Sequence, residues 1–544
     1  MTSSLYQNVK KILHIDRGTF FVLMIYSLTI SLLTLAVPIA AQTLVNLVSF
    51  GTLVRPIFIL TFLLFILLTI AAVIQITRSI VVENLQQSIF ANITLKFAMQ
   101  LNNIKLTSYK DYRGPELVNR FFEVVTVQKT TGIIFLTIID LLLQAIFSMI
   151  VLAFYHPILL AFDIALIITM FLVVILPYRG ALRSAIIESD EKHEVAAWLD
   201  EVAQNPLTFR MNKNDEYAIN KTDSKLLGYI TNRQLHFRNL LKHRIGVLFT
   251  YVAGNTVLLG LGGYLVINGQ LSLGQLIAAE LLVNIILSGF IKLGSYFRDY
   301  YDLLAGVIKL SKVFNLPTDL KKDYHPIDFK LLDDLKSFHS LSVENFSEYN
   351  QNEKNNEISF SITKNQRVLI TDRSIGRIKH LMDQLFSFNL QKYNGKIYIN
   401  GSDLTMYDAN KIRKYFSIVR GLEIFTGTIM DNMCLDRDNI DANDFKKLID
   451  LFNLTSFIHN LPDGYNTEIS GQSFIFNLAF LQKISIIRAI LLRPNFLILE
   501  NSLDIIPENE IGNIISAIDI YTPTAIISTQ RNIFHSHFNH IIEL

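Results

Sequence analysis

The stretch RVLITDRSIGRIKH, Arg367–His380, decides the fold of the C-terminal part of this chain. It opens with an apolar run typical of a buried β-strand, Arg367–Thr371, and then passes through a polar turn. Other short β-type runs alternate with helical stretches beyond about Phe329, and they are Val368–Thr371, Lys396–Ile399, Phe496–Leu499 and Thr524–Ser528. Strands that alternate with helices predict an α/β domain with a largely parallel sheet.

The whole chain has the composition of a membrane protein. Its 544 residues are 51% hydrophobic and 18% charged, and this length predicts two or three domains. The net charge of +2 gives no sign of a nucleic-acid partner. The single cysteine, Cys434, excludes an intramolecular disulfide and a Cys-ligated metal cluster, and we predict no metal site.

Six apolar segments in the N-terminal part are long enough to cross a bilayer, which takes about 20 residues each. A secretory signal is not predicted, because the first apolar stretch is too long and is followed by more of its kind. The six segments are Phe20–Leu44, Ile57–Ile76, Gly132–Phe154, Ile158–Leu176, Ile245–Ile267 and Leu271–Gly294.

The connections between these segments predict the orientation of the chain. Three are short turns, around Ser49–Pro56, Tyr155–Pro157 and Asn268–Gln270. The two long ones, Arg78–Thr131 and Tyr178–Arg244, are rich in Lys and Arg. Because basic loops stay on the cytoplasmic side, we expect both long connections and both termini in the cytoplasm.

Both long connections are expected to continue as helices. Ile89, Ile93 and Phe97 recur every four residues in the first connection, which is helical periodicity. Pro115 interrupts this connection, and Pro206 interrupts the second. Helical extensions that end in short turns would suit docking onto a soluble domain, and the alternative is a simple solvated loop.

A polar, Pro-containing linker is predicted at 315–328. It separates an all-α six-helix membrane domain at 1–314 from an α/β domain at 329–544.

This order of elements resembles a half-transporter of the ABC exporter type, over essentially the whole chain. In the membrane half, YRGPELVNR at Tyr112–Arg120 is similar to the segment with the first coupling turn. The sequence LSLGQL at Leu271–Leu276 is similar to the start of the sixth helix in exporters of type I secretion and peptide export. The resemblance implies coupling residues at Arg113, Gly114, Pro115 and Glu116, and Pro206 is a further candidate.

Framework segments of the soluble half resemble the same family. These are NGKIYINGSDL at Asn394–Leu404, FTGTI at Phe425–Ile429, LPDGYNT at Leu461–Thr467, and RAILLRP at Arg488–Pro494 followed by FLIL at Phe496–Leu499. The implied fold is a P-loop-NTPase-like nucleotide-binding domain, and the implied cofactors are ATP and magnesium.

The phosphate-binding loop of that fold is degenerate in this sequence. Such a loop needs G-x-x-x-x-G-K-[S/T], whose backbone cradles phosphates while the Lys and the hydroxyl reach phosphate and magnesium. The segment Asp372–His380 reads DRSIGRIKH, so its glycines are displaced. Tyr349 is a candidate for stacking on adenine, with Phe346 as an equal alternative. The resemblance places the other nucleotide positions at Ser374, Gly376, Ile378 (for the Lys), Lys379 (for the hydroxyl), His380 and Glu500.

The other positions that the family uses for ATP hydrolysis also carry different residues. Glu500 replaces the magnesium-binding aspartate, a conservative change, but Asn501 replaces the catalytic glutamate and offers no basic carboxylate. Arg420 replaces the glutamine that senses the γ-phosphate, and Gln530 replaces the switch histidine. The signature glycines are lost in FNLAF, which is Phe476, Asn477, Leu478, Ala479 and Phe480.

These losses predict a domain that does not turn over ATP by itself. Phosphoryl transfer depends on positioning and charge stabilisation, and removing one preorganised donor already costs roughly 10²–10³ in rate. Glu500 still offers a carboxylate for magnesium, and Asn477 still offers a donor to the nucleotide of an opposite subunit.

Polar residues inside the apolar segments are candidates for the transport path, because such groups are costly in hydrocarbon. The alternative role is hydrogen bonding between helices. The candidates are Asp140, Gln144, Gln275, Glu280 and Asn284.

The first functional hypothesis is a dimeric transport component in the bacterial inner membrane. Its partner is a second copy or another half-transporter, and a periplasmic adaptor is a further possible partner. One alternative is a non-transporting membrane scaffold or regulator. Another is a true ATP-driven exporter of peptides or proteins with atypical motifs, and drugs or lipids stay open as substrates.

Overall fold

The computed structural model divides the chain into two compact units. One consists of Met1–Asn102 with Asp111–Leu316, and the other of Asn103–Lys110 with Pro317–Leu544. The residues that the structure describes are 16–49, 54–105, 108, 114–211, 216–318, 338–348, 357–371, 377–386, 393–407, 409–437, 440–470, 476–529, 531, 538 and 540–543.

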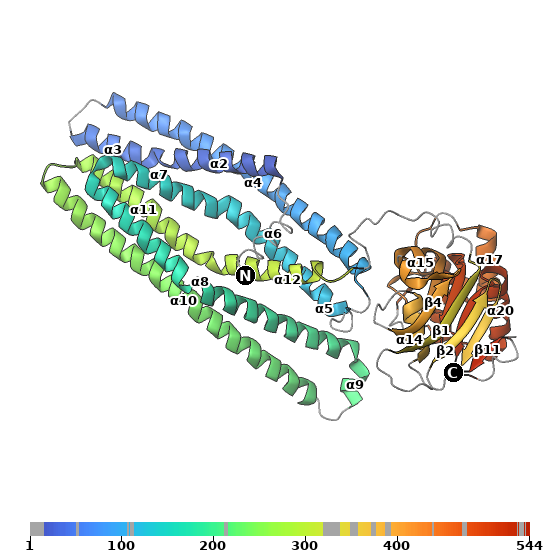
Figure 1. Cartoon of the computed structure of the whole chain (residues 1–544). Coiled ribbons are helices and arrows are strands. Elements are labelled where there is room, and N and C mark those ends of the chain that lie inside the picture. The colour runs from blue at the N-terminus through green and yellow to red at the C-terminus, as the bar shows by residue number, and fades with distance from the viewer. Residues whose placement is uncertain are drawn as a thin grey trace. The chain divides into compact units, whose positions relative to one another are not determined.

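Long helices running side by side form the N-terminal unit (Figure 1). Among the described residues, six helical stretches are long and apolar enough to cross a membrane. Five contain one predicted segment each, and the sixth, Leu273–Ser295, covers all but the first two residues of the segment Leu271–Gly294, so this prediction is confirmed. The helices are α2 (Arg17–Thr34), α3 (Ala36–Ser49), α4 (Arg55–Asn103), α5 (Gly114–Asn119), α6 (Glu123–Ile133), α7 (Ile139–Tyr155), α8 (Pro157–Gln204), α9 (Pro206–Met211), α10 (Glu216–Ile267), α11 (Leu273–Ser295) and α12 (Phe297–Phe314).

The long connections are helical, as the periodicity predicts. α4, α8 and α10 continue far beyond their apolar segments, so neither connection is a simple solvated loop. Pro206 begins the short helix α9 directly after α8 ends, because proline fits the first turn of a helix and not its interior.

Local signals define the tight turns of this unit. His156 accepts a hydrogen bond from the Ile158 N–H at 3.1 Å, and Pro157 opens α8. At the start of α11, the Ser272 hydroxyl accepts from the Gln275 N–H while the Gln275 side chain accepts from the Ser272 N–H. This capping box satisfies donors that the helix start leaves free.

The apolar core of this unit lies where α11 meets α3, α7 and α10, and α8 packs along α10. Leu159, Leu258 and Leu282 belong to this buried cluster. The apolar stretch of α4 is exposed within the single chain, with Phe58 and Phe62 both more than two-thirds exposed. Such a surface suits lipid or a second protein chain.

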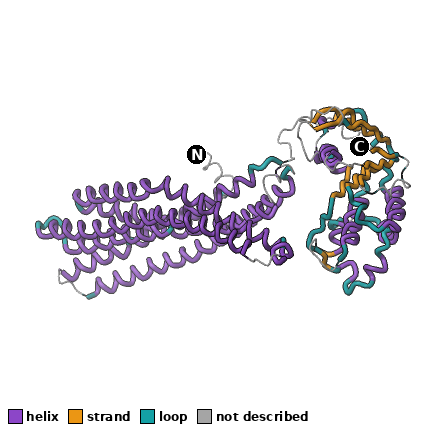
Figure 2. Tube along the Cα trace, turned by 90° about the horizontal axis from the view of Figure 1, so that it is seen from below, coloured by secondary structure: helices purple, strands orange, loops and turns teal. Residues whose placement is uncertain are grey.

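The described strands lie in the C-terminal unit (Figure 2). A five-stranded sheet has the order β11-β3-β10-β9-β6, and a four-stranded sheet has the order β2-β1-β4-β5. The strands are β1 (Ser340–Glu348), β2 (Ile358–Thr363), β3 (Arg367–Thr371), β4 (Tyr393–Ile399), β5 (Ser402–Asp403), β6 (Phe416–Arg420), β7 (Gly427–Thr428), β8 (Glu468–Ile469), β9 (Phe496–Glu500), β10 (Ala525–Thr529) and β11 (Ile541–Glu543).

All pairings within the five-stranded sheet are parallel, as the alternation of strands and helices predicts. The predicted strand at Lys396–Ile399 is real but lies in the other sheet, where β4 pairs antiparallel with β1 and β5. The helices of this unit are α14 (Arg377–Leu385), α15 (Ala409–Tyr415), α16 (Ile429–Cys434), α17 (Ala442–Leu451), α18 (Thr455–His459), α19 (Leu478–Leu491) and α20 (Glu508–Tyr521).

Strand β9 divides the core of the C-terminal unit. Leu497 and Leu499 belong to one buried apolar cluster, and Phe496 and Ile498 belong to a second. Side chains of a strand alternate between the two faces of a sheet, so β9 contributes to a core on each face. Its sequence is therefore apolar at consecutive positions, as expected for a buried parallel strand.

We expect Gly395→Ala to destabilise the C-terminal unit more than Gly401→Ala. Both glycines have a left-handed backbone, with φ of +92° and +82°. A Cβ at Gly395 would lie 2.3 Å from the Asn345 carbonyl oxygen, whereas a Cβ at Gly401 would meet nothing within 4 Å. Gly401→Ala should therefore cost only the conformational strain of about 1–2 kcal/mol.

The measurement is hydrogen exchange in peptides covering β1 and β4 of the purified full-length protein, together with its thermal unfolding midpoint. Equal losses of protection in the two variants would contradict the expected backbone clash at Gly395.

Candidate functional site

The carboxyl ends of the parallel strands bring polar side chains to one edge of the sheet. Arg420 ends β6 and Glu500 ends β9, and the two are register partners in adjacent strands. Ser528 of β10 is the partner of Glu500 on its other side. Open α/β sheets bind their ligands at this edge, so it is the candidate nucleotide site.

Arg420 lies between two carboxylates at this edge. Its Nε donates to Oε2 of Glu500 at 2.5 Å, and its Nη1 donates to Oδ1 of Asp383 at 2.5 Å. Burial opposes the guanidinium charge, but the hydrogen bond to Asp383 and the charges of both carboxylates outweigh it and raise the pKa of Arg420. The resemblance places a magnesium-binding carboxylate at Glu500. In this structure that carboxylate is already paired with the Arg420 guanidinium.

The phosphate-loop residues are only partly described. Ser374 and Gly376 lie outside the described residues, as do the adenine candidate Tyr349, the switch-histidine position Gln530 and the coupling candidate Arg113. Ile378, Lys379 and His380 fall in the first turns of α14, where Lys379 is exposed. Phe346, the alternative adenine candidate, is buried against Tyr393 with ring centroids 5.3 Å apart.

Asn477, Phe476 and Phe480 of the signature segment make their contacts with other residues of the C-terminal unit. The Asn477 side chain accepts a hydrogen bond from the Phe480 N–H at 2.7 Å and so caps α19. Phe476 and Phe480 are buried and stacked on each other, with ring centroids 5.2 Å apart, and Phe457 packs on Phe480 at 4.7 Å. Asn477 and Leu478 are exposed, and Ala479 is half-buried.

Asn501, at the catalytic glutamate position, is tied to the neighbouring strand. Its N–H donates to the Ser528 carbonyl oxygen at 3.0 Å and to the Ser528 hydroxyl at 3.1 Å. Its backbone has a φ of +50°, a conformation that asparagine tolerates better than most residues. The asparagine therefore suits this turn for a reason unrelated to catalysis.

In the membrane half, Asp140 forms an ion pair with the buried Arg78. The same guanidinium donates to the Ser27 hydroxyl at 3.1 Å and to the Leu136 carbonyl oxygen at 3.1 Å. Asp140 thus connects helices α2, α4 and α7, which favours the helix–helix alternative over the transport path.

The other membrane candidates have different surroundings. Gln275 is engaged in the capping box of α11, and Gln144 is half-buried. Glu280 and Asn284 are exposed, and they lie four residues apart on α11. They therefore share a face of that helix.

The sequence analysis missed one acidic residue, Asp163 in the fourth apolar segment. It is 2% exposed, and neither of its carboxyl oxygens has a hydrogen-bond partner among the residues that the structure describes. The signal that identified Asp140, an acid inside an apolar run, was equally present here.

The coupling candidates lie at the ends of the helical extensions. Gly114 and Pro115 open α5, and Glu116 forms an ion pair with Arg120 at 2.7 Å, one helical turn away. Pro206 opens α9. The structure places these residues in short helices that follow breaks in the long ones.

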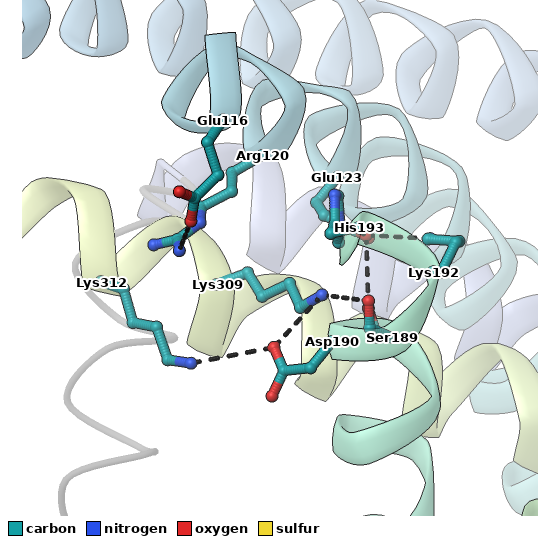
Figure 3. Close-up of polar contacts among 9 residues, drawn as sticks. All are labelled: Glu116, Arg120, Glu123, Ser189, Asp190, Lys192, His193, Lys309 and Lys312. Carbon is teal, nitrogen blue, oxygen red and sulfur yellow. Dashed lines mark hydrogen bonds and ion pairs between the residues drawn. The ribbon is translucent and has the colours of Figure 1, made fainter. Parts of the chain in front are cut away.

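A set of charged contacts joins α6, α8 and α12 close to these breaks (Figure 3). Oε1 of the buried Glu123 lies 3.0 Å from Nζ of Lys192 and 2.8 Å from Nε2 of His193. Burial opposes ionisation of this carboxyl, but the hydrogen bond from His193 and the charge of Lys192 outweigh it and lower the pKa of Glu123 to about 2.

Lys309 provides the link to α12. Its ammonium donates to the Ser189 carbonyl oxygen and lies 3.4 Å from Oδ1 of Asp190, toward which it points in Figure 3. Burial lowers the pKa of Lys309 to about 8, although Asp190 opposes this shift. Lys312 lies 3.8 Å from the same Asp190 oxygen. The helix that precedes the C-terminal unit is therefore attached to α8 by charged contacts.

We expect Glu123→Gln to lower the stability of the protein by about 2–3 kcal/mol at neutral pH, because it removes one partner of a buried charge network. The folded pKa of Glu123 is lower than its unfolded value of 4.5. Its contribution is therefore present above about pH 4.5 and is lost as the pH falls toward 2.

The measurement compares thermal unfolding of the wild type and the variant over this pH range. Glu116→Gln is the matched control, since its partly exposed pair with Arg120 should contribute at most about 0.5 kcal/mol. A difference between wild type and Glu123→Gln that stays constant from pH 6 to pH 3 would refute the assigned role.

No family model matches the chain. A putative export ATP-binding/permease protein of Rickettsia bellii is 23% identical over 479 residues, which cover 86% of this chain and 81% of that protein. The alpha-hemolysin translocation ATP-binding protein HlyB of Escherichia coli O157:H7 and the exotoxin translocation ATP-binding protein PaxB of Pasteurella aerogenes are each 24% identical over 80% of the chain. The chain spans 62% of the length of these two relatives.

Among solved structures, a bacterial Atm1-family ABC exporter with ATP bound superposes with a TM-score of 0.79 at 16% identity. It covers 98% of this chain and 93% of its own length. The chain thus has the fold of an ABC exporter half-transporter, and in sequence it is related to ABC export ATP-binding/permease proteins.

Proposed function

We propose that this chain is a membrane transport subunit of a dimeric exporter whose own nucleotide-binding domain does not hydrolyse ATP. The observation that carries the proposal is the ion pair of Arg420 with Asp383 and Glu500. We further propose that the protein lies in the bacterial inner membrane with both termini in the cytoplasm, as the basic long connections indicate.

Magnesium and Arg420 would compete for the same carboxylate. A magnesium ion needs oxygen ligands at about 2.0–2.1 Å in octahedral geometry. Oε2 of Glu500 already accepts a hydrogen bond from Nε of Arg420 and lies 2.5 Å from its Nη2. Binding the metal would require breaking this pair and leaving a partly buried guanidinium beside a dication. The residues present therefore do not fit a magnesium–nucleotide complex.

The side of the domain that should meet a partner's nucleotide is also altered. The Asn477 oxygen is occupied by the Phe480 N–H, and the two signature aromatics are buried in the domain core. The exposed Leu478 offers an apolar side chain where a backbone approach to phosphate is needed. This surface therefore offers few stabilising contacts to an ATP molecule bound by a partner subunit.

The polar face of α11 supports a dimeric transporter over a scaffold. Glu280 and Asn284 are exposed in the single chain although they lie in an apolar segment. Such groups are stable in a membrane only when they face water or another protein chain. A cavity between two half-transporters supplies both, and the partner is a second copy of this chain or a competent half.

The relatives suggest the kind of substrate. HlyB and PaxB are named for the translocation of a haemolysin and an exotoxin. We therefore propose a peptide or protein substrate, passed to a periplasmic adaptor. The same names favour a second candidate function, an ATP-driven exporter with atypical motifs, and the ATPase measurement separates the two.

We expect the purified full-length chain in nanodiscs to show no magnesium-dependent ATP hydrolysis above the rate of empty nanodiscs. Arg420→Gln should still be inactive, because Ile378 and Asn501 do not supply the missing ammonium and carboxylate. This variant should also unfold at a lower temperature, since two partly buried carboxylates lose their cation.

The matched control for stability is Arg493→Gln, whose pair with Asp444 is at the surface and should contribute about 0–1 kcal/mol. Turnover by the wild type would support the ATP-driven exporter and refute the proposal. Recovery of an intact ATPase half from native membranes would identify the heterodimeric form.

We also expect a cysteine at Glu280 to react with a water-soluble maleimide in membranes, because its helix face borders an aqueous cavity. The background is Cys434→Ser, which removes the single native thiol. Ile164→Cys is the control, since this exposed apolar residue of α8 faces lipid and should stay unlabelled. Labelling of neither position would contradict a water-filled path at α11.

A further inference from the structure

Asp163 is a buried acid for which neither the fold nor the proposed nucleotide site provides a role. It lies in α8 and is 2% exposed, and within the described part of the chain both of its carboxyl oxygens lack a hydrogen-bond partner. Leu159 and Leu166 lie one turn before and after it, on the same helix face. Both are buried in the apolar cluster that also contains Leu258 of α10 and Val283 of α11. The carboxyl is therefore surrounded by apolar side chains within a predicted membrane span.

Among the described residues, no side chain of the surrounding helices forms an ion pair or a hydrogen bond with Asp163. Asp140 of α7 is held by Arg78, and Tyr155 donates to Gln42 at 2.6 Å. The titratable side chains that these helices carry within or beside the spans are Asp140 and Tyr155 of α7, His156, Tyr178 and Arg179 of α8, Lys242, His243, Arg244, Tyr251 and Tyr264 of α10, and the exposed Glu280 and Lys292 of α11. His156 lies about 10 Å from Asp163 along α8 and caps the start of that helix, where its side chain accepts a hydrogen bond from the Ile158 N–H.

The charged groups that contact α8 further along the helix are too distant to neutralise the Asp163 carboxylate. His243 bonds to the Val173 carbonyl oxygen at 3.0 Å, and ten residues of helix correspond to about 15 Å from Asp163. Tyr301 of α12 packs on Tyr178, about 22 Å along the same helix. The contacts of Lys309 lie further still, at Ser189 and Asp190.

An ionised carboxylate without a partner is very costly in such an environment, and a group placed there remains neutral instead. We propose that Asp163 is a proton-binding site that couples this transporter to the proton gradient. The carboxyl holds a proton while α7, α8, α10 and α11 are packed around it. When the transport cycle opens this packing to water, the O–H bond breaks, the proton passes to water and a hydrated carboxylate remains.

This role rests on the proposed function, since a transport subunit without its own ATP hydrolysis needs another source of energy. A gradient of protons across the inner membrane is such a source, and an intramembrane acid is the group that protons can load. The contrast with Asp140 is informative, because Asp140 forms an ion pair with Arg78, whereas Asp163 has no cationic partner among the described residues.

The first test is infrared difference spectroscopy of the purified full-length protein at neutral pH, wild type minus Asp163→Asn. The variant matches the shape and the neutrality of a protonated aspartate, and size-exclusion chromatography checks its fold. Asp163→Leu replaces it if the amide variant does not fold. We expect the C=O stretch of a protonated carboxylic acid in the wild type and its loss in the variant. Absence of this band from the wild type would overturn the proposal.

The second test follows the decay of an imposed pH gradient in proteoliposomes that contain a trapped pH indicator. We expect the wild type to dissipate the gradient faster than protein-free vesicles, and Asp163→Asn to lose this excess rate. Asp200→Asn, on the same helix but outside the predicted span, is the control and should behave as the wild type. Equal decay in wild type and Asp163→Asn would overturn the coupling.

ATP turnover is measured in the same vesicles, so that the two proposals fail separately. Turnover together with the carboxylic acid band refutes the ATP-independent function and leaves the proton site intact. No turnover and no band refutes the proton site alone.

Discussion

A charge removed from water must be neutralised, and this constraint explains the main features of the structure. Inside the membrane unit, Arg78 and Asp140 satisfy each other. In its helical extensions, Glu123 is balanced by Lys192 and His193. Asp163 differs from these acids, because no described residue provides it with such a partner. Isolated buried charges are far more costly than buried apolar groups. A paired buried acid is therefore explained by its structural contacts, whereas an unpaired one calls for a different explanation.

The same constraint separates the frame of the C-terminal unit from its chemistry. The buried strand β9 and the parallel register persist, because they depend on apolar packing alone. At the polar edge of the sheet, Arg420 pairs with two carboxylates. A fold is maintained by packing, whereas a function depends on a few residues placed upon it. The apolar packing of the domain therefore does not depend on which polar residues stand at this edge.

Much of the fold was predictable from the sequence, because its signals are local. An apolar run of about 20 residues indicates a span, and the four-residue spacing of Ile89, Ile93 and Phe97 correctly predicts that helix α4 continues beyond it. Strand β4 is the instructive exception. Its sequence gave the strand correctly, but its antiparallel pairing with β1 depends on a partner some fifty residues away. Local pattern contains no information about that partner.

For the candidate site, the sequence alone identifies which side chains are present, namely Arg420, Glu500 and Asn501 at the positions where the resemblance places ATP chemistry. The tertiary structure decided what these residues do instead. The register of β6 with β9 brings Arg420 to Glu500, and helix α14 supplies Asp383 to the same guanidinium. Asp163 shows the same division, because its identity is local but its lack of a partner depends on three other helices. Burial and pairing are properties of chain segments meeting in space, and for that reason no single stretch of sequence encodes them.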